Sequence, residues 1–166
     1  MLDLGRQAPH VRRAVTGHDA AGKAVVWIDA PANNHKFPDE KITSTLIWVT
    51  DRDPNLLTDV DEGSRVMGTA PPPGGTRCGV LEVQPGNELH GQHRTDTIDY
   101  CVCLSGELEM RLDDTIVVLS AGDILVQRGT NHAWLNRGKK PARLFFVLVD
   151  ACPKRPGSIS GPMQAR

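Results

Sequence analysis

Residues 85–110 (PGNELHGQHRTDTIDYCVCLSGELEM) and residues 121–137 (AGDILVQRGTNHAWLNR) decide the fold of this chain. Each stretch contains short runs of β-branched and apolar residues, and glycine-containing turns separate these runs. Similar runs extend on both sides, over residues 76–150 as a whole. Closely spaced short strands joined by turns are typical of an antiparallel sandwich or barrel. We therefore predict an all-β barrel core over residues 76–150.

The first 75 residues show a sparser strand pattern. Two β-rich runs around a Gly/Asp-containing turn predict a hairpin over residues 12–29, and a further strand is expected over residues 42–50. Residues 51–75 form a polar stretch that is long for a loop in a small domain, which favours a loop that is functional, mobile or wrapped around a partner. We expect residues 1–75 to be an N-terminal extension that packs on the barrel. Residues 151–166, rich in Pro, Gly and Ser, are expected to form a flexible tail.

Composition and charge exclude several classes of protein. The 166 residues contain 19 Lys and Arg against 20 Asp and Glu, so the net charge of −1 provides no general attraction for nucleic acid. No apolar run approaches the roughly 20 residues that span a bilayer, and the N-terminus lacks a secretory signal pattern. The four cysteines are expected to be reduced thiols. We expect a cytoplasmic protein that binds neither nucleic acid nor a membrane.

The spacing of two histidines and a carboxylate supplies a family resemblance. His93 precedes Asp99 with five residues between them, Asp99 precedes Gly106 with six, and His132 precedes Asn136 with three. These spacings resemble the two motifs of the cupin superfamily, in particular its small single-domain conserved-barrel members. The resemblance implies a double-stranded β-helix, or jelly-roll barrel, with the N-terminal hairpin as an extension.

The resemblance also implies a metal site inside the barrel. The ligands that it indicates are His93, His132 and Asp99, which stands where the family has Glu. Thr95 occupies the position of the family's second histidine, so one ligand is missing, and His90 is an alternative replacement from the preceding turn. Two imidazoles and one carboxylate suit one divalent ion of Fe, Zn, Mn, Ni or Co. If no metal binds, the same three side chains would form a hydrogen-bonded polar cluster in a ligand pocket.

Four further residues are candidates for lining the substrate pocket, because they share strand faces with the predicted ligands. Cys101 has two readings, a buried apolar residue and a thiolate ligand, and the first is preferred. The candidate pocket residues are Thr95, Cys101, Trp134 and Asn136.

The resemblance implies a metal-dependent enzyme that acts on a small organic metabolite. The reaction would be that of an oxygenase, or of a Lewis-acid isomerase, cyclase, dehydratase or decarboxylase. The alternative is a non-catalytic cupin that binds a small ligand and has a degenerate metal site. The apolar hairpin residues would leave an exposed patch on a monomer, so we also expect a homodimer formed through residues 12–50.

Overall fold

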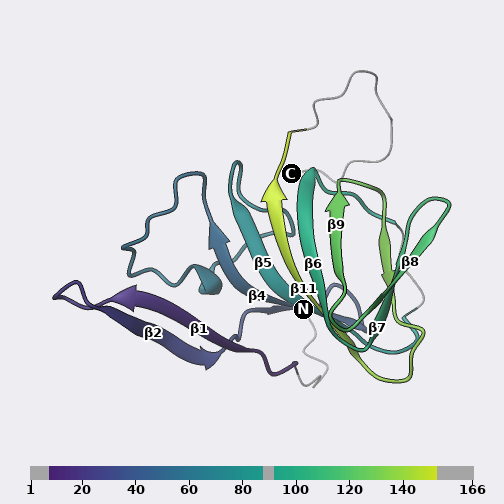
Figure 1. The fold of residues 1–166 in the computed structure, drawn as a ribbon, viewed down its shortest axis with the longest axis horizontal. Helices are drawn as coiled ribbons and strands as arrows, with labels where there is room; N and C mark the ends of the chain where they lie inside the picture. The colour runs from purple at the N-terminus through teal and green to yellow at the C-terminus, as the bar shows by residue number, and fades with distance from the viewer. Residues whose placement is uncertain (1–7, 88–91, 153–166) are drawn as a thin grey trace.

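The computed structural model describes residues 8–87 and 92–152, and β-strands dominate this part of the chain (Figure 1). The short 3-10 helix η1 (Glu62–Ser64) is the one helical element among these residues. The all-β prediction is therefore confirmed. The strands in chain order are β1 (Arg12–His18), β2 (Ala24–Pro31), β3 (His35–Lys36), β4 (Ile42–Thr50), β5 (Thr76–Val83), β6 (Thr97–Ser105), β7 (Glu107–Arg111), β8 (Ile116–Ser120), β9 (Ile124–Arg128), β10 (Ala133–Leu135) and β11 (Ala142–Asp150).

Two antiparallel sheets enclose the core. One sheet has six strands in the order β3-β4-β5-β11-β6-β9, and the other has three in the order β10-β7-β8. Buried side chains from both sheets form a single hydrophobic cluster, which includes Leu108 and Met110 of β7 together with Leu144 and Phe146 of β11. Burial of these apolar side chains between the sheets stabilises the barrel. This arrangement is the jelly-roll barrel that the resemblance implied.

Strand β6 shows the alternation that positions the site. Thr97, Asp99 and Cys101 are buried, whereas the intervening Ile98 and Tyr100 are 37% and 51% exposed. Successive side chains of a strand point to opposite faces, so the buried set faces the barrel interior. The prediction that Asp99 and Cys101 share one face of a strand is therefore confirmed.

The predicted N-terminal hairpin is present, and it forms a sheet of its own. β1 and β2 pair antiparallel and extend to one side of the barrel (Figure 1). The Trp27 ring lies edge-on to the Trp48 ring of β4, with centroids 6.4 Å apart. Arg13 of β1 donates two hydrogen bonds of 2.7 Å to the Asp61 carboxylate in the long loop. The loop over residues 51–75 is thus tied to the hairpin.

Two strands from the first 75 residues belong to the barrel wall. β4 pairs with β5 along its length, and the two-residue strand β3 pairs with β4. No strand was predicted at β3, because its two polar residues, His35 and Lys36, show no hydrophobic alternation. Backbone pairing with Ser44 and Thr45, and a 3.0 Å hydrogen bond between the His35 ring and the Thr45 hydroxyl, hold this segment in place. Within residues 8–87 and 92–152, no helix is long and apolar enough to cross a membrane.

Candidate metal and ligand site

A cavity of about 510 Å³ opens inside the barrel, between the six-stranded sheet and β10. We call the part lined by His93, Asp99 and His132 the histidine end, and the part lined by Lys36 and Arg77 the cationic end. Its volume is in the range of small-molecule sites in proteins. The interior of the barrel is therefore a place where a small ligand and its reacting groups can meet.

A backbone bridge brings the two predicted histidine ligands together. His93 and His132 form an isolated antiparallel bridge, in which each backbone N–H donates to the other residue's carbonyl at 3.0 and 2.9 Å. Residues that face each other in an antiparallel pair project their side chains from the same face. The two imidazole rings accordingly lie with their centroids 4.5 Å apart.

The second histidine is held in one tautomer. His132 Nδ1 lies 2.9 Å from the Thr130 carbonyl oxygen and 3.0 Å from Gln127 Nε2. Because the carbonyl only accepts and the Gln127 amide is directed to the same carbonyl, the tautomer that suits all three groups has its proton on Nδ1. Gln127 Nε2 donates to the same carbonyl at 3.0 Å. The lone pair of His132 is therefore on Nε2. This outer contact is of the kind that orients histidines at metal sites.

Burial keeps both imidazoles neutral. Burial lowers the pKa of His132 to about 4; the Thr130 carbonyl opposes this shift, and the charge of a protonated His93 would add to it. Burial also lowers the pKa of His93. Neutral imidazole is the form that binds a metal or accepts a proton.

Asp99 supplies a buried carboxyl in the same cavity. Burial raises the pKa of Asp99 to about 6, and a hydrogen bond from Thr97 opposes the shift. Its Oδ1 has no hydrogen-bond partner within the part of the chain that the structure describes. A buried carboxylate oxygen without a partner is costly, so this atom is suited to accept a ligand, a proton or a cation.

The three predicted ligands line one cavity, but they do not form a closed cluster. Among residues 8–87 and 92–152, no three His, Cys, Asp or Glu side chains gather closely enough to hold a metal ion. The Thr95 hydroxyl is 2.7 Å from the Thr97 hydroxyl and lines the same cavity. His90, the alternative ligand, lies outside the described residues. The metal site stays a prediction.

The four candidate pocket residues divide into two groups. Thr95, Cys101 and Trp134 line the cavity, whereas Asn136 does not. The Asn136 amide donates 2.8 Å hydrogen bonds to the carbonyls of Val83 and Lys140, so this buried side chain connects the loop after β10 to β5. Burial, together with the nearby Asp99 charge, raises the pKa of Cys101 to about 12, so the side chain is a buried thiol when no metal ion is bound.

The cationic end was missed by the sequence analysis. Arg77 is only 4% exposed, although it begins the run that forms β5. The alternation that places Leu81 in the cavity also places Arg77 there, since the two are four residues apart on one strand. A charged residue at an inward position of a predicted strand was the signal. Lys36 gave no comparable signal, because the two-residue strand β3 could not be predicted.

Comparison with known proteins gives the family. The family model described as Cupin domain matches residues 79–148. The chain is 36% identical over 163 residues to the "Phomopsin biosynthesis cluster protein C'" of Diaporthe leptostromiformis, an alignment that covers 89% of this chain and 84% of that protein. It is 31% identical over 159 residues to the "Cupin-domain-containing oxidoreductase virC" of Hypocrea virens, with 88% and 80% covered.

A solved structure agrees on the fold. The cupin domain of Schizosaccharomyces pombe Cnp3 superposes with a TM-score of 0.51 and 14% identity, covering 84% of this chain and 87% of that one. At this identity the likeness concerns the fold alone. Fold, motif spacing and relatives agree, and the chain belongs to the cupin family.

Proposed function

We propose that this protein is a metal-dependent cupin enzyme that acts on a small organic metabolite. One observation carries the proposal: two neutral imidazoles in ring contact share a cavity with a buried carboxylate oxygen that lacks a partner. Perturbed titratable groups gathered in a cavity are typical of active sites.

The donor chemistry of the histidine end fits a divalent metal. His93 and His132 would each supply a ring nitrogen, and Asp99 would supply the oxygen that now has no partner. The Thr130 carbonyl leaves His132 Nε2 unprotonated, as ligation requires. When bound, such a metal supplies Lewis acidity or redox chemistry. Fe, Zn, Mn, Ni and Co all accept this donor set.

The remaining lining residues would shape the reaction. Trp134 stands beside His132, with ring centroids 6.2 Å apart, and together with Phe146 and Leu144 it gives the cavity apolar walls. Such walls hold an organic ligand and exclude water from the reacting groups.

The relatives support an enzyme of small-molecule biosynthesis. Their printed names include phomopsin and oryzines biosynthesis cluster proteins and several cupin-domain-containing oxidoreductases. Among the reactions that the resemblance implied, these names favour an oxidation over isomerisation, cyclisation, dehydration or decarboxylation. The substrate itself is not identified by these names.

Metal analysis combined with oxygen uptake tests the proposal. The full-length protein should bind close to one divalent ion, and it should consume oxygen with a member of a panel of phenols, diketones and hydroxy acids. His132→Ala should lose both properties, whereas His18→Ala, at an exposed hairpin position, should keep both. A folded wild-type protein without bound metal and without turnover of any panel member would contradict the proposal.

A non-catalytic ligand-binding cupin is the second candidate. The observation that favours it is that two imidazoles, rather than three or more metal-binding groups, come together in the described part of the chain. In that case the cavity would bind its ligand without metal. Ligand affinity that is unchanged by a strong chelator would separate this candidate from the enzyme.

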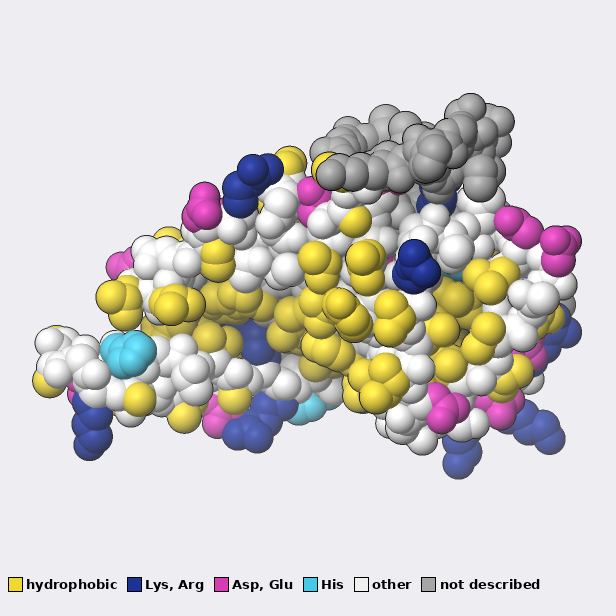
Figure 2. All heavy atoms as spheres, turned by 45° about the horizontal axis from the view of Figure 1, so that its top comes forward, with side chains coloured by type: hydrophobic (Ala, Val, Ile, Leu, Met, Phe, Trp, Pro, Cys, Tyr) yellow, Lys and Arg dark blue, Asp and Glu magenta, His cyan; other side chains and the backbone are white. Residues whose placement is uncertain are grey.

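We also propose that the protein is a homodimer formed through residues 12–50. In Figure 2 apolar side chains gather over the middle of this face, beside the hairpin at its lower left. On the hairpin, Val26 is 62% exposed and Trp27 is 36% exposed. Pairing about a two-fold axis would cover such side chains, and two-fold dimers are the commonest closed assembly.

A further inference from the structure

The cationic end of the cavity holds the buried guanidinium of Arg77, and some of its N–H donors have no acceptor among the described residues. Arg77 Nη1 donates to the Thr69 carbonyl at 3.3 Å, and Nη2 donates to the Ser44 hydroxyl at 3.1 Å. Its Nε has no acceptor within the described residues. A guanidinium has five N–H donors, so three are left after these two bonds.

The two hydrogen bonds of Arg77 go to a carbonyl and a hydroxyl, and the Asp39 carboxylate lines the same cavity. Burial lowers the pKa of Arg77, and burial together with the Arg77 charge lowers the pKa of Lys36. Two cations that repel each other therefore line one end of a cavity. Burial of the Arg77 charge is costly, and an anion bound between Arg77 and Lys36 would offset that cost.

The ring of Phe146 supports the guanidinium from one side. Arg77 Cζ lies 5.1 Å from the ring centroid, within cation–π range. The Ser44 hydroxyl and the Thr69 carbonyl hold the other parts of the group. Contacts of this kind fix the orientation of the guanidinium before a ligand arrives, which reduces the entropy lost on binding.

The register of the six-stranded sheet fixes the distance between the two ends. Arg77 pairs with Leu148, Leu148 pairs with Asp99, and Asp99 pairs with Gln127, so these four residues form one row across β5, β11, β6 and β9. All four are buried on the inner face. Two strand spacings of about 4.8 Å separate Arg77 from Asp99, which puts their backbones roughly 10 Å apart.

We propose that Arg77 and Lys36 form a carboxylate-binding subsite, which orients an acidic substrate so that its apolar body extends toward His93 and His132. The inference rests on the proposed function, because it assumes that the cavity takes an organic substrate. A carboxylate suits the subsite since its two oxygens match the paired N–H donors of a guanidinium. Leu81, Phe146 and Trp134 give the cavity apolar walls, against which such a body can pack.

Matched acidic and neutral probes test the subsite. Calorimetric titration of the full-length protein with 4-phenylbutyrate and with 4-phenylbutanamide compares a carboxylate with an uncharged group of the same shape. We expect the acid to bind at least about tenfold more tightly, the scale of a hydrogen bond between charged groups. Equal affinities, or no detectable binding of the acid at millimolar concentration, would overturn the inference.

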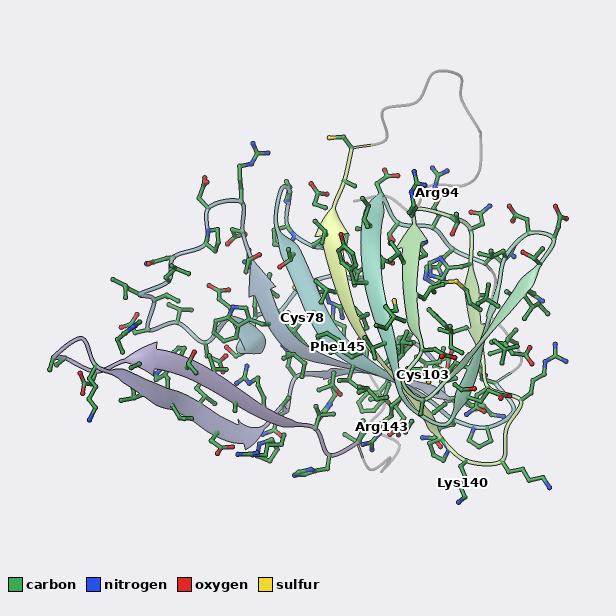
Figure 3. The ribbon with its side chains drawn as sticks, viewed as in Figure 1. Cys78, Arg94, Cys103, Lys140, Arg143 and Phe145 are labelled. Carbon is green, nitrogen blue, oxygen red and sulfur yellow. The ribbon has the colours of Figure 1, made fainter. Side chains whose placement is uncertain are left out.

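Substitutions of Arg77 and Lys36 test whether these two cations cause the preference for the acid over the amide. Arg77→Met should remove the preference for the acid and leave amide binding within about twofold, and Lys36→Met should reduce the preference several-fold. Lys140→Met is the matched control, because Lys140 is exposed and points away from the barrel (Figure 3). An acid preference that persists in both cavity variants would overturn the inference. If Arg77→Met fails to fold, Arg77→Lys keeps the charge but loses the paired N–H donors and should reduce the preference several-fold, while Lys36→Met still tests the loss of a charge.

Measuring bound metal distinguishes a failure of the carboxylate subsite from a failure of the metal-dependent enzyme. Arg77→Met and Lys36→Met should bind as much metal as the wild-type protein, since neither residue belongs to the histidine end. A wild-type protein that binds metal and turns over a neutral substrate, but shows no acid preference, contradicts the subsite alone. A protein that prefers the acid without binding metal supports the subsite and contradicts the metal-dependent enzyme.

Discussion

The histidine end and the cationic end of the cavity come from different parts of the chain. His93, Asp99 and His132 lie within residues 79–148, the segment that matches the cupin family model, whereas Lys36 and Arg77 lie outside it. At the first end burial shifts groups that titrate near neutral pH, and at the second it encloses two cations. If both proposals hold, the family segment supplies the metal ligands, and residues that precede it, on β3 and at the start of β5, bind the carboxylate.

Loss of the second histidine should have the largest effect. We expect His132→Ala to reduce metal affinity more than the roughly 10–100-fold that follows loss of an outer-shell partner, because a ligand itself is removed. Metal titration of the purified variant measures the change. His18→Ala should match the wild-type protein, and equal losses in the two folded variants would show that the histidine end is not the metal site.

Asn136 tests whether a buried residue beside the histidine end is structural. Asn136→Ala leaves the carbonyls of Val83 and Lys140 without their donor, so the free energy of unfolding should fall by about 2–4 kcal/mol. Metal bound per folded molecule should not change. Denaturant unfolding measures the effect, and Asn131→Ala, with a single long contact at the surface, should change stability by no more than about 0.5 kcal/mol.

Thr95 tests the vacant position at the histidine end. Thr95→His adds an imidazole to the cavity and should raise metal affinity by about tenfold, at the lower end of the effects seen around metal sites. Competition with a chromophoric chelator would measure this gain. Thr115→His, at an exposed position, controls for an added surface histidine. An unchanged affinity would show that Thr95 does not face the metal.

The proposed dimer interface on the hairpin can be tested in the same way, and we expect its single substitutions to have the smallest effect. Light scattering of the wild-type protein should give about twice 18.1 kDa. Val26→Glu should weaken the dimer by about fivefold, the scale of most single interface residues, and leave metal content unchanged. Val118→Glu, equally apolar and 51% exposed on β8, should leave the dimer intact. A wild-type monomer at micromolar concentration would exclude the dimer.

Most of the fold could be predicted from the sequence, because the barrel strands carry local signals. Alternating apolar residues and glycine turns predicted β4 with its exact bounds, and they placed the barrel core over residues 76–150, where β5–β11 lie. β3 could not be predicted, since two polar residues gain their strand geometry only by pairing with β4. Propensity says little about a segment whose structure depends on a partner strand.

The two ends of the cavity differed in how well they could be predicted. Motif spacing indicated His93, Asp99 and His132, and the structure places all three in one cavity. Asn136 fits the same motif, but its side chain bonds to the backbone of neighbouring segments. The alternation of β5 marks Arg77 as an inward-facing residue, but its place in the cavity also depends on the pairing of β5 with β11, a long-range contact that no local pattern contains.

The most direct test of the account is a crystal structure of the wild-type protein grown with Zn²⁺ and measured at the zinc absorption edge. The account predicts an anomalous peak inside the barrel, with ring nitrogens of His93 and His132 at about 2.0–2.1 Å and a carboxylate oxygen of Asp99 at about 2.0–2.2 Å. A barrel without an anomalous peak, or an ion held elsewhere while His93 and His132 remain free, would contradict it.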